Sequence, residues 1–153
     1  MSDQNIAQVD VRGPRFTAWV TTVVIVATLA LSAVSPVTAA VLLGLQAVVF
    51  AVGAVGGPRR HPYGRIFATL VAPRLGPVRT TDPVPPLKFA QAVGFAFAVV
   101  GTLGFATGLI GLGLGATALA LVAAFLNAAF GICLGCQLYP LVARLRRAPA
   151  PSS

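Results

Sequence analysis

Acidic residues are nearly absent from this chain, since Asp3, Asp10 and Asp82 are the only three among 153 residues. Charged residues of both signs make up only 9%, against about 25% in an ordinary soluble domain. A soluble fold of this size could not cover its surface with so few charges, whereas lipid can solvate an apolar outer face. Together with a hydrophobic content of 57%, this scarcity of charge predicts an integral membrane protein.

Cysteine and histidine are also scarce, with 2 cysteines and a single histidine, His61. A closed zinc site usually has four ligands, so we expect neither a metal nor another cofactor. His61 lies in a polar loop, where we expect it to be solvated. The apolar runs contain no acid, so the sequence offers no carboxylate relay for protons or cations. No nucleophile–base pair is visible, and the question whether the protein is an enzyme stays open.

Four apolar runs are long enough to cross a bilayer as helices, at about 1.5 Å rise per residue against a hydrocarbon core of roughly 30 Å. We expect a cytoplasmic tail over residues 1–15, a membrane domain over 16–142 and a basic, disordered tail over 143–153. The expected spans cover about residues 16–34, 37–55, 89–109 and 116–138. The predicted fold class is an all-α membrane protein with four transmembrane helices.

A polar, proline-rich loop of residues 58–88 separates the second and third spans. Within it, the apolar side chains of Tyr63–Leu75 fall on one helical face, which predicts a short helix lying on the membrane surface. We expect Pro83–Pro86 to be extended, because proline also restricts the residue before it. The loop's basic side chains flank apolar spans, so we expect them to bind anionic lipid headgroups and not nucleic acid. They are Arg59, Arg60, Arg65, Arg74, Arg79 and Lys88.

The basic residues also predict the orientation of the chain. All 11 lie before the first span, in the loop of residues 58–88 or after the fourth span. With four spans, these three places are on the same side of the membrane. The positive-inside rule makes that side cytoplasmic, so we expect a multi-pass plasma-membrane protein with both termini in the cytoplasm.

Three amides, Gln46, Gln91 and Asn127, fall within the apolar runs. A polar side chain in lipid needs a hydrogen-bond partner, so these amides are expected to face other helices. Contacts between helices are the simplest role for them. Binding of a substrate is the alternative.

The two cysteines, Cys133 and Cys136, form a Cys-x-x-Cys pair at the end of the last apolar run. On a continuous fourth helix they would share a face near its cytoplasmic C-terminus, where the helix dipole disfavours a thiolate. The reducing cytoplasm argues against a permanent disulfide. The residues leave three interpretations open, which are a redox or sulfur-carrying pair, a metal site and small packing residues.

Several short stretches together carry a family resemblance. They are Gly53–Pro58, His61–Gly64, Pro73–Pro77, Pro85–Gln91 and Asn127–Tyr139, the last with a Gly-x-Cys-x-Gly-Cys pattern. Through them, roughly residues 10–140 resemble a bacterial family of small membrane proteins catalogued only as a domain of unknown function. Its members are often encoded near, or fused to, thioredoxin- or rhodanese-like proteins. The resemblance implies thiol or sulfur chemistry at the cytoplasmic face of a bacterial plasma membrane, with Cys133 and Cys136 as the candidate pair.

Three functional hypotheses remain. The first is a membrane-bound dithiol that exchanges disulfide or persulfide with a cytosolic thioredoxin- or rhodanese-like protein, with Cys136 nearer water and Cys133 resolving. The second is a membrane subunit or scaffold without enzymatic activity, in which the cysteines pack and glycine pairs mediate helix contacts within one chain or in a homo-oligomer. The third is an oligomeric transporter of a small sulfur species that uses Gln46, Gln91 and Asn127.

Overall fold

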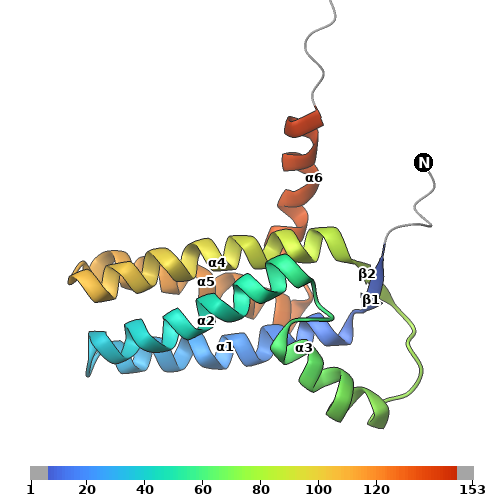
Figure 1. Ribbon diagram of the computed structural model, residues 1–153, viewed down its shortest axis with the longest axis horizontal. Coiled ribbons are helices and arrows are strands. Elements are labelled where there is room, and N and C mark those ends of the chain that lie inside the picture. Colours follow the sequence, from blue (N-terminus) through green and yellow to red (C-terminus); the bar gives the residue numbers. More distant parts are fainter. Residues whose placement is uncertain (1–6, 148–153) are drawn as a thin grey trace, which may run out of the picture.

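The computed structural model describes residues 7–147, and most of these residues are helical (Figure 1). Four long helices run back and forth to form a bundle, and each packs against two neighbours. All four are long and apolar enough to cross a membrane, which confirms the expected all-α, multi-pass architecture. They are α1 (Arg12–Ser32), α2 (Pro36–Gly56), α4 (Val84–Thr107) and α5 (Ile110–Phe130).

All four long helices begin earlier than expected, at residues 12, 36, 84 and 110. α1 begins at Arg12 because an Asp10 carboxylate oxygen accepts the backbone N–H of Arg12 at 3.0 Å. At the start of α2, the Ser35 hydroxyl oxygen accepts the Thr38 N–H at 3.2 Å. α4 begins at Val84, so the expectation of an extended Pro83–Pro86 segment is wrong. Proline is tolerated in the first turn of a helix, where its missing N–H would have no intrahelical partner.

The fourth span ends much earlier than expected, at Phe130. Gly131 has φ 70°, the left-handed conformation that often terminates a helix. Its N–H bonds to the Asn127 carbonyl at 3.0 Å, and the N–H of Ile132 bonds to the Leu126 carbonyl at 3.1 Å. The expectation of one continuous helix over 116–138 is therefore wrong.

After Gly131 the chain turns sharply and forms α6 (Leu134–Arg147), which leaves the bundle and points across its axis (Figure 1). Residue 138, where the fourth span was expected to end, lies inside this helix, as does Pro140. The expected basic tail over 143–153 is helical up to Arg147, and its remainder lies outside the described residues.

The loop between α2 and α4 contains the expected short helical segment. It consists of α3 (Pro62–Ile66), a π-helical stretch η2 (Phe67–Val71) and a 3-10 turn η3 (Ala72–Arg74). This segment extends away from the same end of the bundle as α6 (Figure 1). Phe67 anchors it, since its ring is buried and lies 5.7 Å from the ring of Phe16 on α1.

Two short strands at this end of the bundle were not expected. β1 (Gln8–Asp10) pairs antiparallel with β2 (Thr81–Pro83), with Val9 opposite Asp82. The described part of the expected N-terminal tail is therefore structured, and residues 1–6 lie outside the described residues. The ribbon joins the start of α1 to the start of α4.

The bundle is held together mainly by small side chains and glycines, which let apolar helices approach closely. Its core cluster lies between α2 and α4 and comprises Ala39, Ala40, Leu43, Ala47, Phe50, Ala98 and Phe105. Closer to the α4–α5 turn, Gly104 touches the backbone of α5: a Cβ placed there would lie 2.5 Å from the Gly113 nitrogen. Gly111 and Gly115, by contrast, face open space.

Candidate functional site

The Cys-x-x-Cys pair lies at the start of a helix. The Cys133 carbonyl oxygen accepts the Gln137 N–H at 3.0 Å, the first backbone bond of α6, so Cys133 is the N-cap residue. The backbone N–H of Cys136 donates to Cys133 Sγ at 3.2 Å. The expectation that the pair approaches a helix C-terminus is thus wrong, because Gly131 ends α5 first. At an N-terminus the helix dipole favours a thiolate.

Cys133 and Cys136 are joined by a disulfide, with their Cα atoms 5.1 Å apart. Both side chains are half-buried. Gly135, between them, packs directly on α4, because a Cβ at this position would lie 2.6 Å from the Cα of Ala90. The start of α6 is therefore held against the bundle by a backbone contact that only glycine permits.

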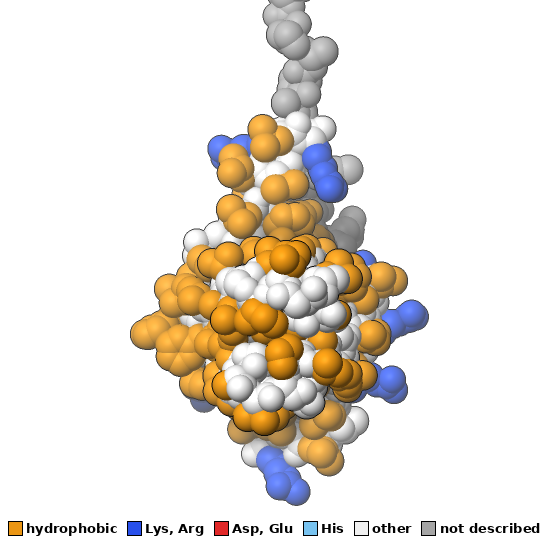
Figure 2. Space-filling model, turned by 90° about the vertical axis from the view of Figure 1, so that its left-hand side faces the viewer, with side chains coloured by type: hydrophobic (Ala, Val, Ile, Leu, Met, Phe, Trp, Pro, Cys, Tyr) orange, Lys and Arg blue, Asp and Glu red, His pale blue; other side chains and the backbone are white. Residues whose placement is uncertain are grey.

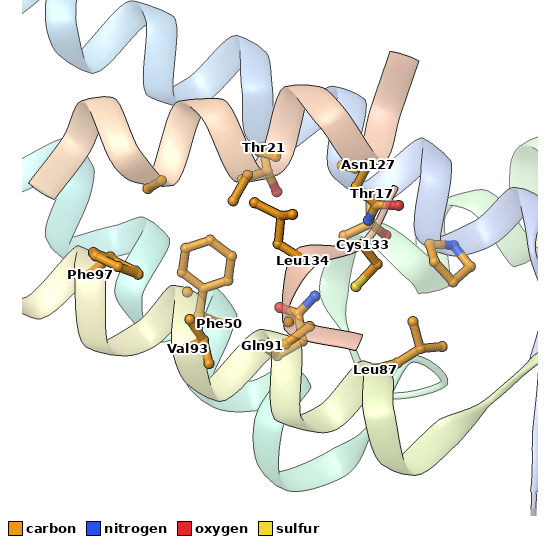
Figure 3. Close-up of a pocket in the computed structure, with 18 of the residues that line it drawn as sticks. Thr17, Thr21, Phe50, Leu87, Gln91, Val93, Phe97, Asn127, Cys133 and Leu134 are labelled. Atoms are coloured by element: carbon orange, nitrogen blue, oxygen red, sulfur yellow. The ribbon is translucent and has the colours of Figure 1, made fainter. Parts of the chain in front are cut away.

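Cys133 also lines a cavity of about 310 Å³ inside this end of the bundle. In Figure 3 its sulfur lies among the labelled side chains of Thr17, Asn127, Gln91 and Leu87. The walls come from α1, α2, α4, α5 and the start of α6, together with Pro58 and His61 from the loop after α2. Most of the lining is apolar, with a few polar groups, which is the usual make-up of a small-molecule site.

His61 is buried in this wall, with only 1% of its surface exposed, so the expectation that it is solvated is wrong. Its Nδ1 accepts the backbone N–H of Tyr63 at 3.2 Å, which leaves the ring proton on Nε2. Burial lowers the pKa of His61 from 6.5 to about 4, and the neighbouring Gln91 amide offsets part of that effect. His61 is therefore neutral at physiological pH.

The three intramembrane amides occupy different surroundings. Gln46 is buried, and its Oε1 accepts the Tyr63 hydroxyl at 2.7 Å, so its partner lies on the short helix α3. Gln91 and Asn127 both line the cavity. The structure thus brings two of the three amides together with Cys133.

Three buried polar atoms on the cavity wall have no hydrogen-bond partner within the described residues. They are Thr21 Oγ1, His61 Nε2 and Gln91 Oε1. An unpaired buried polar group costs about 1–3 kcal/mol, so such a cluster marks a place where a ligand or water would be stabilised. Sequence reasoning missed Thr21 and His61, because nothing in their spacing along the chain shows that they face the same space.

Arg15 is a further residue that sequence reasoning missed. Its guanidinium donates to the carbonyl oxygens of Ala128 at 3.2 Å and Ala129 at 3.4 Å, at the C-terminal end of α5. A cation is favourable there because the helix dipole is negative at that end. Arg15 therefore fixes α1 to the last turn of α5, next to the loop that carries Cys133.

The predicted lipid-binding cations lie at this same end of the molecule. Arg59, Arg60, Arg65, Arg74 and Arg79 are exposed and Lys88 is half-buried. Within residues 7–147, the one salt bridge joins Arg12 to Asp10 at 2.7 Å, so none of these six is paired with an acid. The same described residues contain no group of three or more His, Cys, Asp or Glu that could hold a metal.

The fold and the site together define a four-helix, multi-pass membrane protein with a Cys-x-x-Cys pair at the edge of an apolar cavity. Residues 9–144 match a family described as a domain of unknown function (DUF4395). The match covers most of the chain, so the protein belongs to this family, as the resemblance implied. No match was found among curated proteins or among solved structures.

Proposed function

We propose that this protein is a membrane-bound dithiol that exchanges disulfides with a thioredoxin-like protein on the cytoplasmic side of a bacterial plasma membrane. The observation that carries the proposal is the Cys133–Cys136 pair at the N-terminus of α6, where a backbone N–H reaches Cys133 Sγ at 3.2 Å. That position favours release of Cys133 as a thiolate. The positive-inside rule, applied to the 11 basic residues, supports the orientation.

The exchange has a definite chemical order. A thiolate of the partner attacks Cys136 Sγ, the bond between the two sulfurs of the pair breaks, and Cys133 leaves as the thiolate. The partner's second thiol then attacks the mixed disulfide, and its proton goes to the departing sulfur of Cys136. Two electrons pass to the pair, and the partner leaves as a disulfide. With the pair in the reduced form, the Cys136 thiolate would attack the outer sulfur of a rhodanese-like partner's persulfide, so that Cys136 becomes a persulfide and the partner's cysteine leaves as a thiolate.

Trapping of the mixed disulfide tests this order. A thioredoxin whose resolving cysteine is replaced by serine is incubated with Cys133→Ser and, in parallel, with Cys136→Ser, each first activated as the mixed disulfide with thionitrobenzoate. The cysteine that remains in Cys133→Ser is Cys136. We expect it to capture the thioredoxin faster than Cys133, which remains in Cys136→Ser. Equal capture by both variants would contradict the proposal that the partner attacks Cys136, and capture by neither would contradict the proposed function.

Reactivity with a small alkylating reagent provides a second test. The lone thiol in Cys136→Ser keeps its position at the N-cap of α6, so we expect it to react about tenfold faster at pH 7 than the lone thiol in Cys133→Ser. The rates are measured in detergent by mass spectrometry. Equal rates in folded protein would show that the helix terminus does not activate Cys133.

A structural role is the second candidate, and the contact between Gly135 and Ala90 favours it. In that case the disulfide only fixes the turn between α5 and α6. The Cys133→Ser, Cys136→Ser double variant separates the two roles. A normal oligomeric state with lost thiol-stress resistance supports exchange, whereas unchanged resistance supports the structural role.

A further inference from the structure

The cavity beside Cys133 has an apolar rim that faces outward. Leu119 and Val122 of α5 line it and are 58% and 52% exposed, and Leu138 of α6 is 48% exposed. Since α5 is one of the membrane-crossing helices, the outward surface at Leu119 and Val122 faces lipid. A ligand that enters beside these side chains comes from the bilayer and must itself be mainly apolar.

The inner wall offers a hydrogen-bond donor and an acceptor on the neighbouring side chains of His61 and Gln91, and neither atom forms a hydrogen bond of good geometry. His61 carries its proton on Nε2, because its Nδ1 accepts from Tyr63, so the unpaired Nε2–H is a donor. Gln91 Oε1 is an unpaired acceptor, and the Thr21 hydroxyl can act as either. A ligand that alternates between a carbonyl and a hydroxyl group would be recognised in both forms by this set.

The size of the cavity limits the ligand further. A volume of about 310 Å³ lies at the lower end of the range for small-molecule sites, roughly 300–1,000 Å³. It suits one substituted ring, and an attached aliphatic tail could leave between the exposed apolar residues of the rim. The rings of Phe50 and Phe97 contribute flat apolar surface to the wall.

We propose that the cavity binds the head group of a membrane-soluble quinone, with His61 and Gln91 at its oxygens, and that this quinone reoxidises the Cys133–Cys136 dithiol. Of the chemical classes that are apolar, ring-sized and able to alternate between carbonyl and hydroxyl, quinones also accept two electrons. Cys133 lines the cavity, so the reacting sulfur and the acceptor share one space. The inference rests on the proposed function for the source of its electrons.

The electrons and atoms of this step balance. Two S–H bonds break and one S–S bond forms, which releases two electrons and two protons. The quinone takes up both, so its two C=O groups become two C–OH groups and it leaves as the quinol. The protein returns to the disulfide form, ready for the next reduced partner.

Binding is tested apart from electron transfer. The Cys133→Ser, Cys136→Ser variant in quinone-free nanodiscs is titrated with decylubiquinone, whose fully substituted ring resists direct addition of thiols. We expect saturable binding that weakens at least about tenfold when Ala123→Phe fills the cavity. The matched control is Ala118→Phe, which adds the same ring to an exposed position of α5, and we expect unchanged binding. Should Ala123→Phe fail to fold, the isosteric Thr21→Val takes its place, with an expected loss of about 3- to 10-fold.

Electron transfer is then measured with the wild-type protein. After reduction and removal of the reductant, we expect one decylubiquinol formed for each disulfide regained, and none in the double serine variant. Non-saturable binding, binding that the cavity variants leave unchanged, or binding without quinol formation would each overturn the inference. In these cases intact capture of thioredoxin leaves the proposed function standing, whereas loss of capture removes that function instead.

Discussion

The two ends of the helix bundle differ in their connections, their charge and the side chains they bring together. At one end, α1 and α2 are joined by the short turn at Ser35, α4 and α5 by the turn at Gly108, and helix backbones touch at Gly104. Figure 2 looks onto this end, where uncharged groups cover the face and Lys and Arg appear only at the margins. The other end carries the strands, α3, α6, the cysteines and the cavity (Figure 1). One end of the bundle therefore closes the structure, and the other contains the groups capable of chemistry.

The largest expected effect comes from added volume, which the two ends should tolerate differently. Gly104→Leu places a side chain against the backbone of Gly113, and we expect a loss of about 3 kcal/mol in stability. Ala123→Phe at the other end enters the cavity, and we expect a change below about 1 kcal/mol. Thermal unfolding in detergent measures both. Equal destabilisation would mean that the cavity is not free space.

Acid should destabilise the cavity end through His61, whose pKa falls from 6.5 to about 4 on folding. The unfolded chain binds the proton more readily, so the stabilisation is complete above pH 6.5 and is lost as the pH falls toward 4, by about 3 kcal/mol. Thermal unfolding as a function of pH measures this loss. His61→Gln is the control because it cannot titrate, and the contributions of Asp10 and Asp82 remain in both proteins. Parallel pH profiles for the two proteins would contradict the burial of His61.

A smaller effect is expected at the break between α5 and α6. Gly131 has φ 70°, so Gly131→Ala should cost about 1–2 kcal/mol and shift the start of α6. Gly115→Ala is the matched control on the same helix, because it faces open space and should stabilise by about 0.5–1 kcal/mol. Thermal unfolding shows whether each substitution raises or lowers the stability of the protein. Stabilisation by both substitutions would indicate that α5 continues beyond Gly131.

The smallest effect is expected at the charge-free end. Ser35→Ala removes the N-cap of α2, whose hydroxyl accepts the Thr38 N–H at 3.2 Å, and should cost about 1 kcal/mol. We expect no change in the reactivity of the two cysteines, which is measured by alkylation. A changed alkylation rate would show that the two ends of the bundle are coupled.

The sequence was sufficient to predict four helices long and apolar enough to cross a membrane, because hydrophobic length alone distinguishes such helices. It did not reveal the end of α5, since Gly131 could equally have been one of the small packing residues common in such helices. That single glycine reverses the helix-end environment of the cysteines. The burial of His61 could not be predicted either. It depends on how the loop after α2 folds back onto α4, and the residues around His61 do not indicate that long-range contact.

The β1–β2 ribbon also constrains the order in which the protein can assemble. It joins residues 8–10 to residues 81–83, so it cannot form until the chain has been synthesised well past α2. Pairing of the two strands holds the start of α1 beside the start of α4, and both helices contribute walls of the cavity. Cys133 and Cys136 come later in the chain than all of these parts. The sulfur pair is thus synthesised after the cavity walls on α1 and α4, and of the lining residues only Leu138 follows it.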